Sequence, residues 1–123
     1  MGNEIFLDTS IVIGWILENE PSHKNCEEIL QAIKTKKHKI LLSVFNISEI
    51  FYALQRNRFT LTRIKEIVVG LHSLPNIQIA KITSSQCIEG IKLAEKYSID
   101  LTDAITYILM KKYQIKEIYS LDK

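Results

Sequence analysis

The apolar positions of this chain alternate between short continuous runs and helical spacings. Four short runs are typical of buried strands, and they cover residues 4–7, 39–44, 77–82 and 117–121. Between them, apolar residues recur at intervals of three and four, as at Cys26, Ile29, Leu30 and Ile33. Strands that alternate with helices favour βαβ units and hence a parallel sheet.

Four later segments carry apolar residues at helical spacing, and each predicts a helix with one buried face. The residues that mark these faces are Ile47, Ile50, Phe51 and Leu54; Leu61, Ile64, Val68 and Leu71; Ile88, Ile91 and Ala94; and Leu101, Ile105, Ile108 and Leu109. We therefore expect a single-domain α/β fold, a three-layer sandwich in which helices cover both faces of a parallel sheet.

The composition is that of one globular domain, because 46% of the 123 residues are hydrophobic and 24% are charged. The longest apolar run, at 11–17, is too short to cross a membrane. The first residues lack the basic and then apolar layout of a secretory signal. We expect residues 1–123 to form one domain without a membrane partner, in a cytoplasmic protein.

The cysteines and histidines do not indicate a metal site. Cys26 and Cys87 belong to no paired motif, so both are expected to be small buried hydrophobes. The histidines at 23, 38 and 72 have no partner at a metal-ligand spacing. Sixteen basic and fourteen acidic residues give a net charge of +2, which by itself does not indicate a nucleic-acid-binding protein.

Acidic residues follow the predicted strands at the carboxyl edge of the sheet. In open α/β folds, ligands usually bind at this edge. Asp8 comes directly after the first run and Asp122 directly after the last. Glu49 is expected in the opening turn of the helix that leaves the second strand. Asp103 lies near the start of a later helix, with Asp100 three residues before it. These side chains are expected to converge.

Each acid also has a structural explanation, since a carboxylate caps or stabilises a helix N-terminus. That explanation is weaker for the whole group. Two carboxylates about 5 Å apart repel by roughly 3 kcal/mol at an effective dielectric constant near 20. A hard cation such as Mg²⁺ would relieve the repulsion, and it prefers oxygen ligands.

Other chemistries that use acids fit the sequence less well. A haloacid-type phosphotransferase needs a second aspartate where Ser10 stands. The chain has only four glycines and no glycine-rich phosphate loop, which excludes a P-loop and a dinucleotide fingerprint. A receiver-like signalling domain would need an acidic neighbour beside Asp8. Metal-assisted cleavage of phosphodiester bonds remains the best interpretation.

At this point the sequence resembles the PIN-domain family, and in size it is most similar to the VapC toxins of type II toxin–antitoxin pairs. The similar stretches are 5–10, 42–50, 101–105 and 118–123, in the family's order. The resemblance implies a parallel sheet of four or five strands and an endoribonuclease that depends on Mg²⁺ or Mn²⁺. It also implies RNA as the substrate and an antitoxin partner that blocks the acidic pocket.

The resemblance assigns roles by position. Asp8, Glu49 and Asp103 match the three core acids and Asp122 matches the fourth, as catalytic and metal-binding residues. Thr9, Ser10 and Ser120 match the supporting hydroxyl positions beside them, and Asp100 is a supporting residue outside the core pattern. Family members usually continue beyond the fourth acid, so this chain is expected to lack that C-terminal extension.

Further expectations concern RNA and protein partners. Arg56, Arg58 and Arg63 cluster after the helix of Glu49, where they could contact RNA phosphates. A homodimer is expected, with Trp15 and Tyr52 as possible contributors to it or to an antitoxin groove, although core packing is the favoured prediction for both. The alternative function is a catalytically silent PIN-fold module that binds RNA or acts as a scaffold.

Overall fold

The structure is a computed structural model that describes residues 4–35 and 37–121. The described part contains one parallel sheet, with strand order β3-β2-β1-β4. The strands are β1 (Glu4–Leu7), β2 (Lys39–Ser43), β3 (Ile77–Ala80) and β4 (Ile118–Tyr119). The predicted four strands and their parallel pairing are therefore confirmed.

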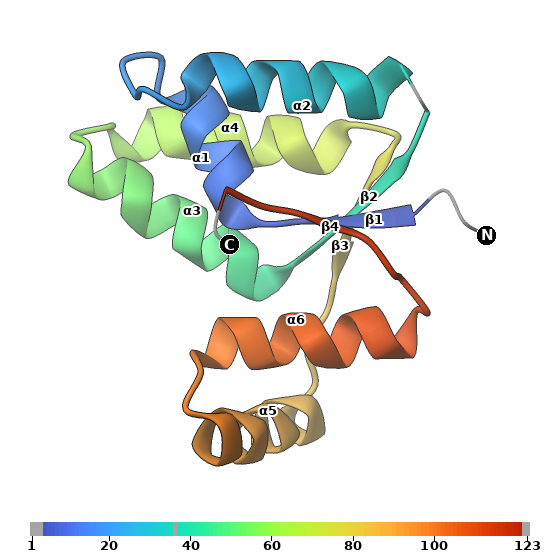
Figure 1. The fold of residues 1–123 in the computed structure, drawn as a ribbon. Coiled ribbons are helices and arrows are strands. Elements are labelled where there is room, and N and C mark those ends of the chain that lie inside the picture. Colours follow the sequence, from blue (N-terminus) through green and yellow to red (C-terminus); the bar gives the residue numbers. More distant parts are fainter. Residues whose placement is uncertain (1–3, 36, 122–123) are drawn as a thin grey trace.

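Six helices connect the strands in the described residues. They are α1 (Thr9–Ile16), α2 (His23–Thr35), α3 (Val44–Arg56), α4 (Leu61–Ser73), α5 (Ser84–Tyr97) and α6 (Leu101–Lys112). Helices α1 to α4 lie on one side of the sheet, and α5 and α6 lie on the other (Figure 1). This arrangement confirms the predicted three-layer α/β sandwich.

Alternating residues of the central strands supply two cores. Ile5 and Leu7 of β1 are buried against the layer of α1 to α4, whereas Phe6 is buried against α6. In β2, Leu42 faces the first core and Leu41 the second. Because successive side chains of a strand point to opposite faces, a strand between two helical layers needs an unbroken apolar run.

Polar caps determine where several helices begin. The Asp8 carboxylate accepts a hydrogen bond from the backbone of Ser10 at the start of α1. Ser43 and Asn46 form a capping box at the start of α3, and Thr83 and Gln86 form one at α5. The Ser43 cap explains why β2 ends at Ser43, one residue earlier than the apolar run predicts. Strand β3 ends at Ala80, two residues before the end of its apolar run.

Helices α1 and α2 approach each other closely at Gly14. A Cβ atom at this position would lie 2.5 Å from Cys26 Sγ, so only glycine allows this contact without a shift. Cys26 is fully buried, as predicted, and its burial raises the pKa of the thiol. Cys87 is only partly buried. No helix in the described ranges is both long and apolar enough to span a membrane.

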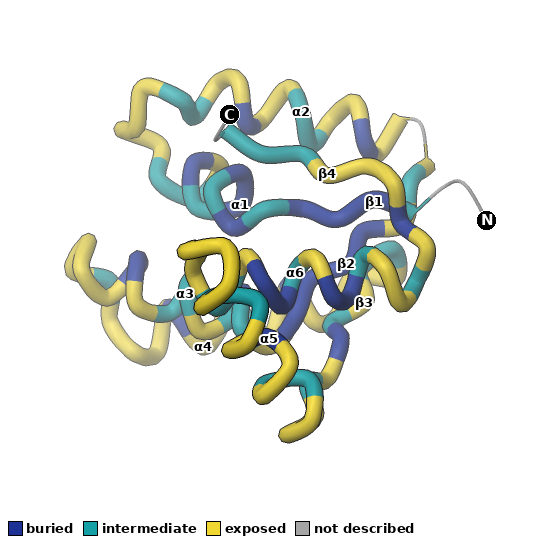
Figure 2. Tube along the Cα trace, turned by 60° about the horizontal axis from the view of Figure 1, so that its bottom comes forward, coloured by how far each residue is buried: buried dark blue, intermediate teal, exposed yellow. Residues whose placement is uncertain are grey.

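Several predictions of burial are wrong, including that of Leu61, which is 63% exposed. Ile88 and Ile91 are 57% and 55% exposed, although their spacing predicts a buried face. The residue of α5 that faces α6 is instead Gly90. A Cβ atom at this position would lie 2.8 Å from Ile105 Cδ1, so the two helices approach closely here. Most of α5 is therefore exposed (Figure 2). Trp15 and Tyr52 are also exposed rather than packed in the core.

Candidate active site

A pocket of about 520 Å³ opens at the carboxyl edge of the sheet, where β1 and β2 lead into α1 and α3. Residues of α1, α3 and the start of α6 line it together. The lining residues are Asp8, Thr9, Ser10, Ile13, Ser48, Glu49, Tyr52, Ala53, Arg56, Asp100 and Asp103. All three aspartates in the described part of the chain lie here, although they are remote in sequence.

Asp8 is held by three hydrogen bonds to one carboxylate oxygen. Its Oδ2 accepts from the Ser10 hydroxyl at 2.6 Å, from the Ser10 backbone N–H at 3.2 Å and from the Ser120 hydroxyl at 3.1 Å. Asp8 therefore caps α1 and also lines the pocket. The capping and functional explanations of this residue are compatible, since one carboxylate does both.

Ser10 joins this carboxylate to the end of the described chain. Its hydroxyl oxygen accepts a hydrogen bond of 3.1 Å from the Leu121 backbone N–H. The Asp8 backbone N–H donates to Tyr119 O at 2.9 Å, which continues the pairing of β1 with β4. The segment after β4 is thus held beside the pocket. Asp122, the predicted fourth acid, lies outside the described residues.

Glu49 lies in the second turn of α3 rather than in its opening turn, because α3 already begins at Val44. The prediction of its place in the helix is therefore wrong by one turn, since Ser43 ends the strand earlier than expected. At this depth the carboxylate does not cap the helix. Its Oε1 instead accepts a hydrogen bond of 2.7 Å from the Thr9 hydroxyl of α1.

Asn46 belongs to the same cluster and was not predicted as a site residue. It is buried, and its amide nitrogen donates to Thr9 Oγ1 at 2.9 Å. A signal for it exists in the sequence, because Asn46 precedes Glu49 by one helical turn and follows the cap residue Ser43 by three positions. Its contact with Thr9 depends on the packing of α1 against α3 and cannot be derived from spacing.

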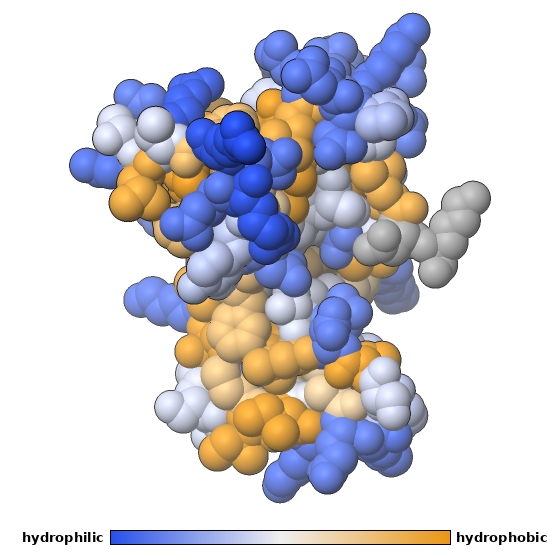
Figure 3. Space-filling model, turned by 90° about the vertical axis from the view of Figure 1, so that its left-hand side faces the viewer, coloured by the Kyte–Doolittle hydropathy of each residue, from blue (hydrophilic) through white to orange (hydrophobic). Residues whose placement is uncertain are grey.

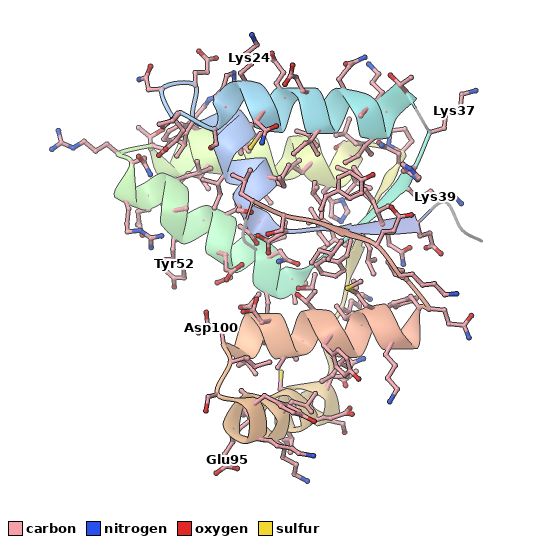
Figure 4. All side chains as sticks on the ribbon, viewed as in Figure 1. Lys24, Lys37, Lys39, Tyr52, Glu95 and Asp100 are labelled. Carbon is pink, nitrogen blue, oxygen red and sulfur yellow. The ribbon has the colours of Figure 1, made fainter. Side chains whose placement is uncertain are left out.

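The start of α6 supplies the opposite side of the pocket. Asp103 lies in the first turn of α6, as predicted. Asp100 occupies the N-cap position but makes no side-chain capping hydrogen bond, so capping does not explain it. Tyr52 lies on the part of α3 that faces the end of α6 at which Asp100 stands (Figure 4), and it lines the pocket while 55% exposed.

The three predicted RNA-binding arginines are placed differently. Arg56 is the arginine among the pocket's lining residues, one turn beyond Tyr52 on α3. Arg58 follows α3 in a left-handed backbone conformation with φ of 66°. Arg63, in the first turn of α4, lies 3.5 Å from Glu66, and both side chains are exposed. Only the first of the three is therefore adjacent to the carboxylates.

The polar lining offers oxygen ligands, which suits a hard divalent cation better than a transition metal that prefers nitrogen or sulfur. Within residues 4–35 and 37–121, however, no three His, Cys, Asp or Glu side chains converge closely enough to hold one ion. The pocket is an open acidic depression rather than a closed cage. Such a site fits Mg²⁺, which retains part of its water shell in proteins.

The sequence and the fold are both similar to those of known proteins. The chain is 27% identical over 122 residues to ribonuclease VapC1 of Aquifex aeolicus (strain VF5), covering 98% of this chain and 82% of that protein. The fold is similar to that of VapC20 of Mycobacterium tuberculosis, a toxin that cleaves the sarcin-ricin loop. The TM-score is 0.83 at 16% identity, over 96% of this chain and 89% of VapC20.

A second solved structure, a toxin–antitoxin complex from Klebsiella pneumoniae, has a TM-score of 0.61 at 16% identity. It covers 94% of this chain and 84% of that chain. At these identities the two structures establish the fold alone. The family model of the PIN domain matches residues 5–123, nearly the whole sequence. The chain therefore belongs to the PIN-domain family, as its four similar stretches predict.

Proposed function

We propose that this chain is an endoribonuclease that depends on a divalent cation, and that it is the toxin of a type II toxin–antitoxin pair. The observation that carries the proposal is the meeting of Asp8, Glu49 and Asp103 at one pocket of a PIN domain. The relationship to ribonuclease VapC1 supports RNA as the substrate. The similarity to a toxin–antitoxin complex supports the toxin role.

Asp8, Glu49 and Asp103 would hold Mg²⁺ or Mn²⁺ in this pocket partly through the cation's own water molecules, since the described side chains do not converge on one point. Hydroxyl donors already orient two of these carboxylates, through Thr9 for Glu49 and through Ser10 and Ser120 for Asp8. A bound cation would supply Lewis-acid activation of water and would neutralise charge on the scissile phosphate. The chain itself then has to orient its carboxylates and position the RNA.

Asp122 is proposed as the fourth acid. The Leu121 backbone, which immediately precedes it, is hydrogen-bonded to Ser10. This contact supports a place for Asp122 near Asp8, and Asp100 is proposed as a supporting residue at the rim of the pocket. We also propose that residues 1–123 form one PIN-like domain.

Arg56 is proposed to bind an RNA phosphate at the mouth of the pocket, because it is a cation among lining carboxylates. A phosphodiester backbone approaching these acids needs such a positive group to offset their repulsion. Arg58 and Arg63 are proposed to contribute only to the general attraction of RNA, since neither lines the pocket.

An antitoxin is proposed to cover the same pocket. Four carboxylates, those of Asp8, Glu49, Asp100 and Asp103, make the lining predominantly negative. A partner segment that places a lysine or arginine over them would form charge-assisted hydrogen bonds and would exclude RNA. Inhibition of cleavage by the product of the neighbouring gene would test this partner.

A homodimer is proposed through α5 and α6. Figure 3 shows apolar side chains gathered over these helices, which carry the exposed Ile88, Ile91, Tyr97 and Tyr107. More than half of each of these four side chains is exposed. Together they expose apolar area on the order of 400 Å², which would supply about half of the ~800 Å² that each partner buries in a stable interface. Helix α5 carries two lysines and two glutamates, so it does not repel a second copy electrostatically.

RNA cleavage by purified protein tests the proposal. The parent should cleave RNA with Mg²⁺ or Mn²⁺ and stop when EDTA is added. Asp103→Asn should lower the rate by at least about 100-fold, because it removes a carboxylate needed in the reaction. The matched control is Glu95→Gln on exposed α5, which should cleave like the parent. A parent that binds RNA but neither cleaves it nor takes up a cation would favour the silent-module alternative.

A further inference from the structure

We infer that Asn46 is a positioning residue that acts on Glu49 through Thr9, and this inference rests on the proposed function of the pocket. The three side chains form a chain of hydrogen bonds from the start of α3 to the pocket. Asn46 Nδ2 lies 2.9 Å from Thr9 Oγ1, and Thr9 Oγ1 lies 2.7 Å from Glu49 Oε1.

The orientation of the Asn46 amide is determined by its neighbour. The Ser43 backbone N–H lies 2.8 Å from one end of the amide, and a backbone N–H can only donate. That end must therefore be the oxygen, Oδ1, which also accepts from the Ser43 hydroxyl at 3.0 Å. The NH₂ end consequently faces Thr9, where it can only donate.

This orientation determines what the Thr9 hydroxyl can do. A hydroxyl has one proton and two lone pairs, and the Asn46 NH₂ group occupies one lone pair. The single proton of Thr9 is then available for the carboxylate of Glu49, at a distance typical of an O–H donor. Asn46 thus makes Thr9 a donor to Glu49 and keeps the carboxylate oriented toward the pocket that it lines.

Burial shows that this chain of bonds is more than a helix cap. The buried polar residues in the described part of the protein are Ser43, Asn46 and Thr9, with exposures of 0%, 1% and 5%. Asn46 and Thr9 are members of the series, and Ser43 is the partner that orients Asn46. The capping box uses only Oδ1 of Asn46. A cap would not need the NH₂ group to be buried against a threonine. Such groups are costly to bury, so their satisfied network favours one rigid arrangement.

Mn²⁺ binding by calorimetry tests the inference without relying on cleavage. Asn46→Leu and Thr9→Val each remove one member of the hydrogen-bonded series while keeping the branched shape of the side chain. Each should raise the Mn²⁺ dissociation constant about tenfold, in the range known for residues that orient metal ligands. The double variant should bind about as the single ones do, because both changes break the same path. Thr9→Ser retains the hydroxyl and should bind like the parent.

The matched control is Asn57→Leu at the other end of α3. The Asn57 side chain donates to Ala53 O at 2.8 Å, so its loss also removes a hydrogen bond from the same helix. This variant should unfold at a lower temperature yet bind Mn²⁺ like the parent. Asn46→Leu should differ from it in Mn²⁺ affinity, a quantity that the loss of a cap alone would not change.

The outcomes separate this inference from the proposed function. A parent that takes up no Mn²⁺ would contradict the function of the site. If the parent binds Mn²⁺ and a folded Asn46→Leu protein binds it equally well, the role of Asn46 is wrong. If the double variant loses Mn²⁺ affinity by the product of the two single losses, Asn46 does not act on Glu49 through Thr9. If Asn46→Leu does not fold, parent-like binding by Thr9→Val would overturn the inference.

Discussion

Ser120 donates a hydrogen bond of 3.1 Å to Asp8 Oδ2, across a separation of 112 residues in the sequence. Ser120 follows β4 and Asp8 follows β1, and these strands are parallel neighbours in the sheet. The bond therefore joins two chain segments at the edge where the carboxylates meet. It shows how a sheet register, set by backbone pairing, places a hydroxyl on a carboxylate.

This contact predicts a role for Ser120 in orienting Asp8. Ser120→Ala should weaken Mn²⁺ binding several-fold, which is less than the roughly 10- to 100-fold losses seen for groups that orient metal ligands, because Ser10 still holds the carboxylate. Calorimetric titration with Mn²⁺ measures the change. Ser73→Ala is the control, since Ser73 only donates to Val69 O within α4. Equal affinities in both variants would contradict the role.

Cation binding should stabilise the parent. At ten times its dissociation constant, Mn²⁺ should add about 1.4 kcal/mol to the free energy of unfolding. Asp103→Asn should show little of this gain, because it removes one of the carboxylates that line the pocket. Thermal denaturation with and without Mn²⁺ measures both shifts. Similar Mn²⁺-induced shifts in the two proteins would place the cation elsewhere.

Arg56, which lines the pocket, and Arg63, which does not, should differ in their contribution to RNA binding. In an Asp103→Asn background, which is expected to prevent cleavage, Arg56→Gln should weaken RNA binding and lower the slope of log K against log[salt] by about one. Arg63→Gln is the matched control, because its side chain lies beside Glu66 and outside the pocket lining. Fluorescence anisotropy at several salt concentrations separates them. Identical slopes in the two variants would refute a special contact at Arg56.

The close approach of α1 and α2 predicts opposite effects for two glycine substitutions. Gly14→Ala should destabilise the protein by about 1–3 kcal/mol, because the new methyl group would overlap Cys26 Sγ. Gly70→Ala in exposed α4 has no atom within 4 Å of its Cβ, so it should stabilise by up to about 1 kcal/mol through helix propensity. Urea denaturation measures both. A stabilised Gly14→Ala protein would show that the helices can separate at little cost.

The apolar surface of α5 and α6 predicts the oligomeric state. The parent should have the mass of a dimer in light scattering, and Ile91→Lys should shift it toward the monomer by placing a charge in the interface. Val69→Lys on α4 is the control, because Val69 is a similarly exposed apolar residue on the other helical layer. A monomeric parent, or a dimer that Ile91→Lys leaves intact, would contradict this interface.

The sequence by itself determined the order of the elements and the acidic residues at their ends. A strand with a nearly continuous apolar run, such as 4–7, is stable only between two helical layers. The composition of the run therefore predicts that both faces of the strand are buried. Asp8 directly follows this strand and Asp103 opens a helix, so their common edge follows from the parallel topology. The capping residues Ser43 and Thr83 are equally local signals.

Only the tertiary structure decided which groups touch. The amide of Asn46 acquires its partner because α1 packs against α3, and no spacing in the sequence specifies that contact. Ile88 and Ile91 show the opposite case, since their helical spacing is real but Gly90 faces α6 and leaves them exposed. Periodicity reports which residues share a face of a helix. The face that is buried depends on close approaches between elements, which are decided by shape and not by hydrophobicity alone.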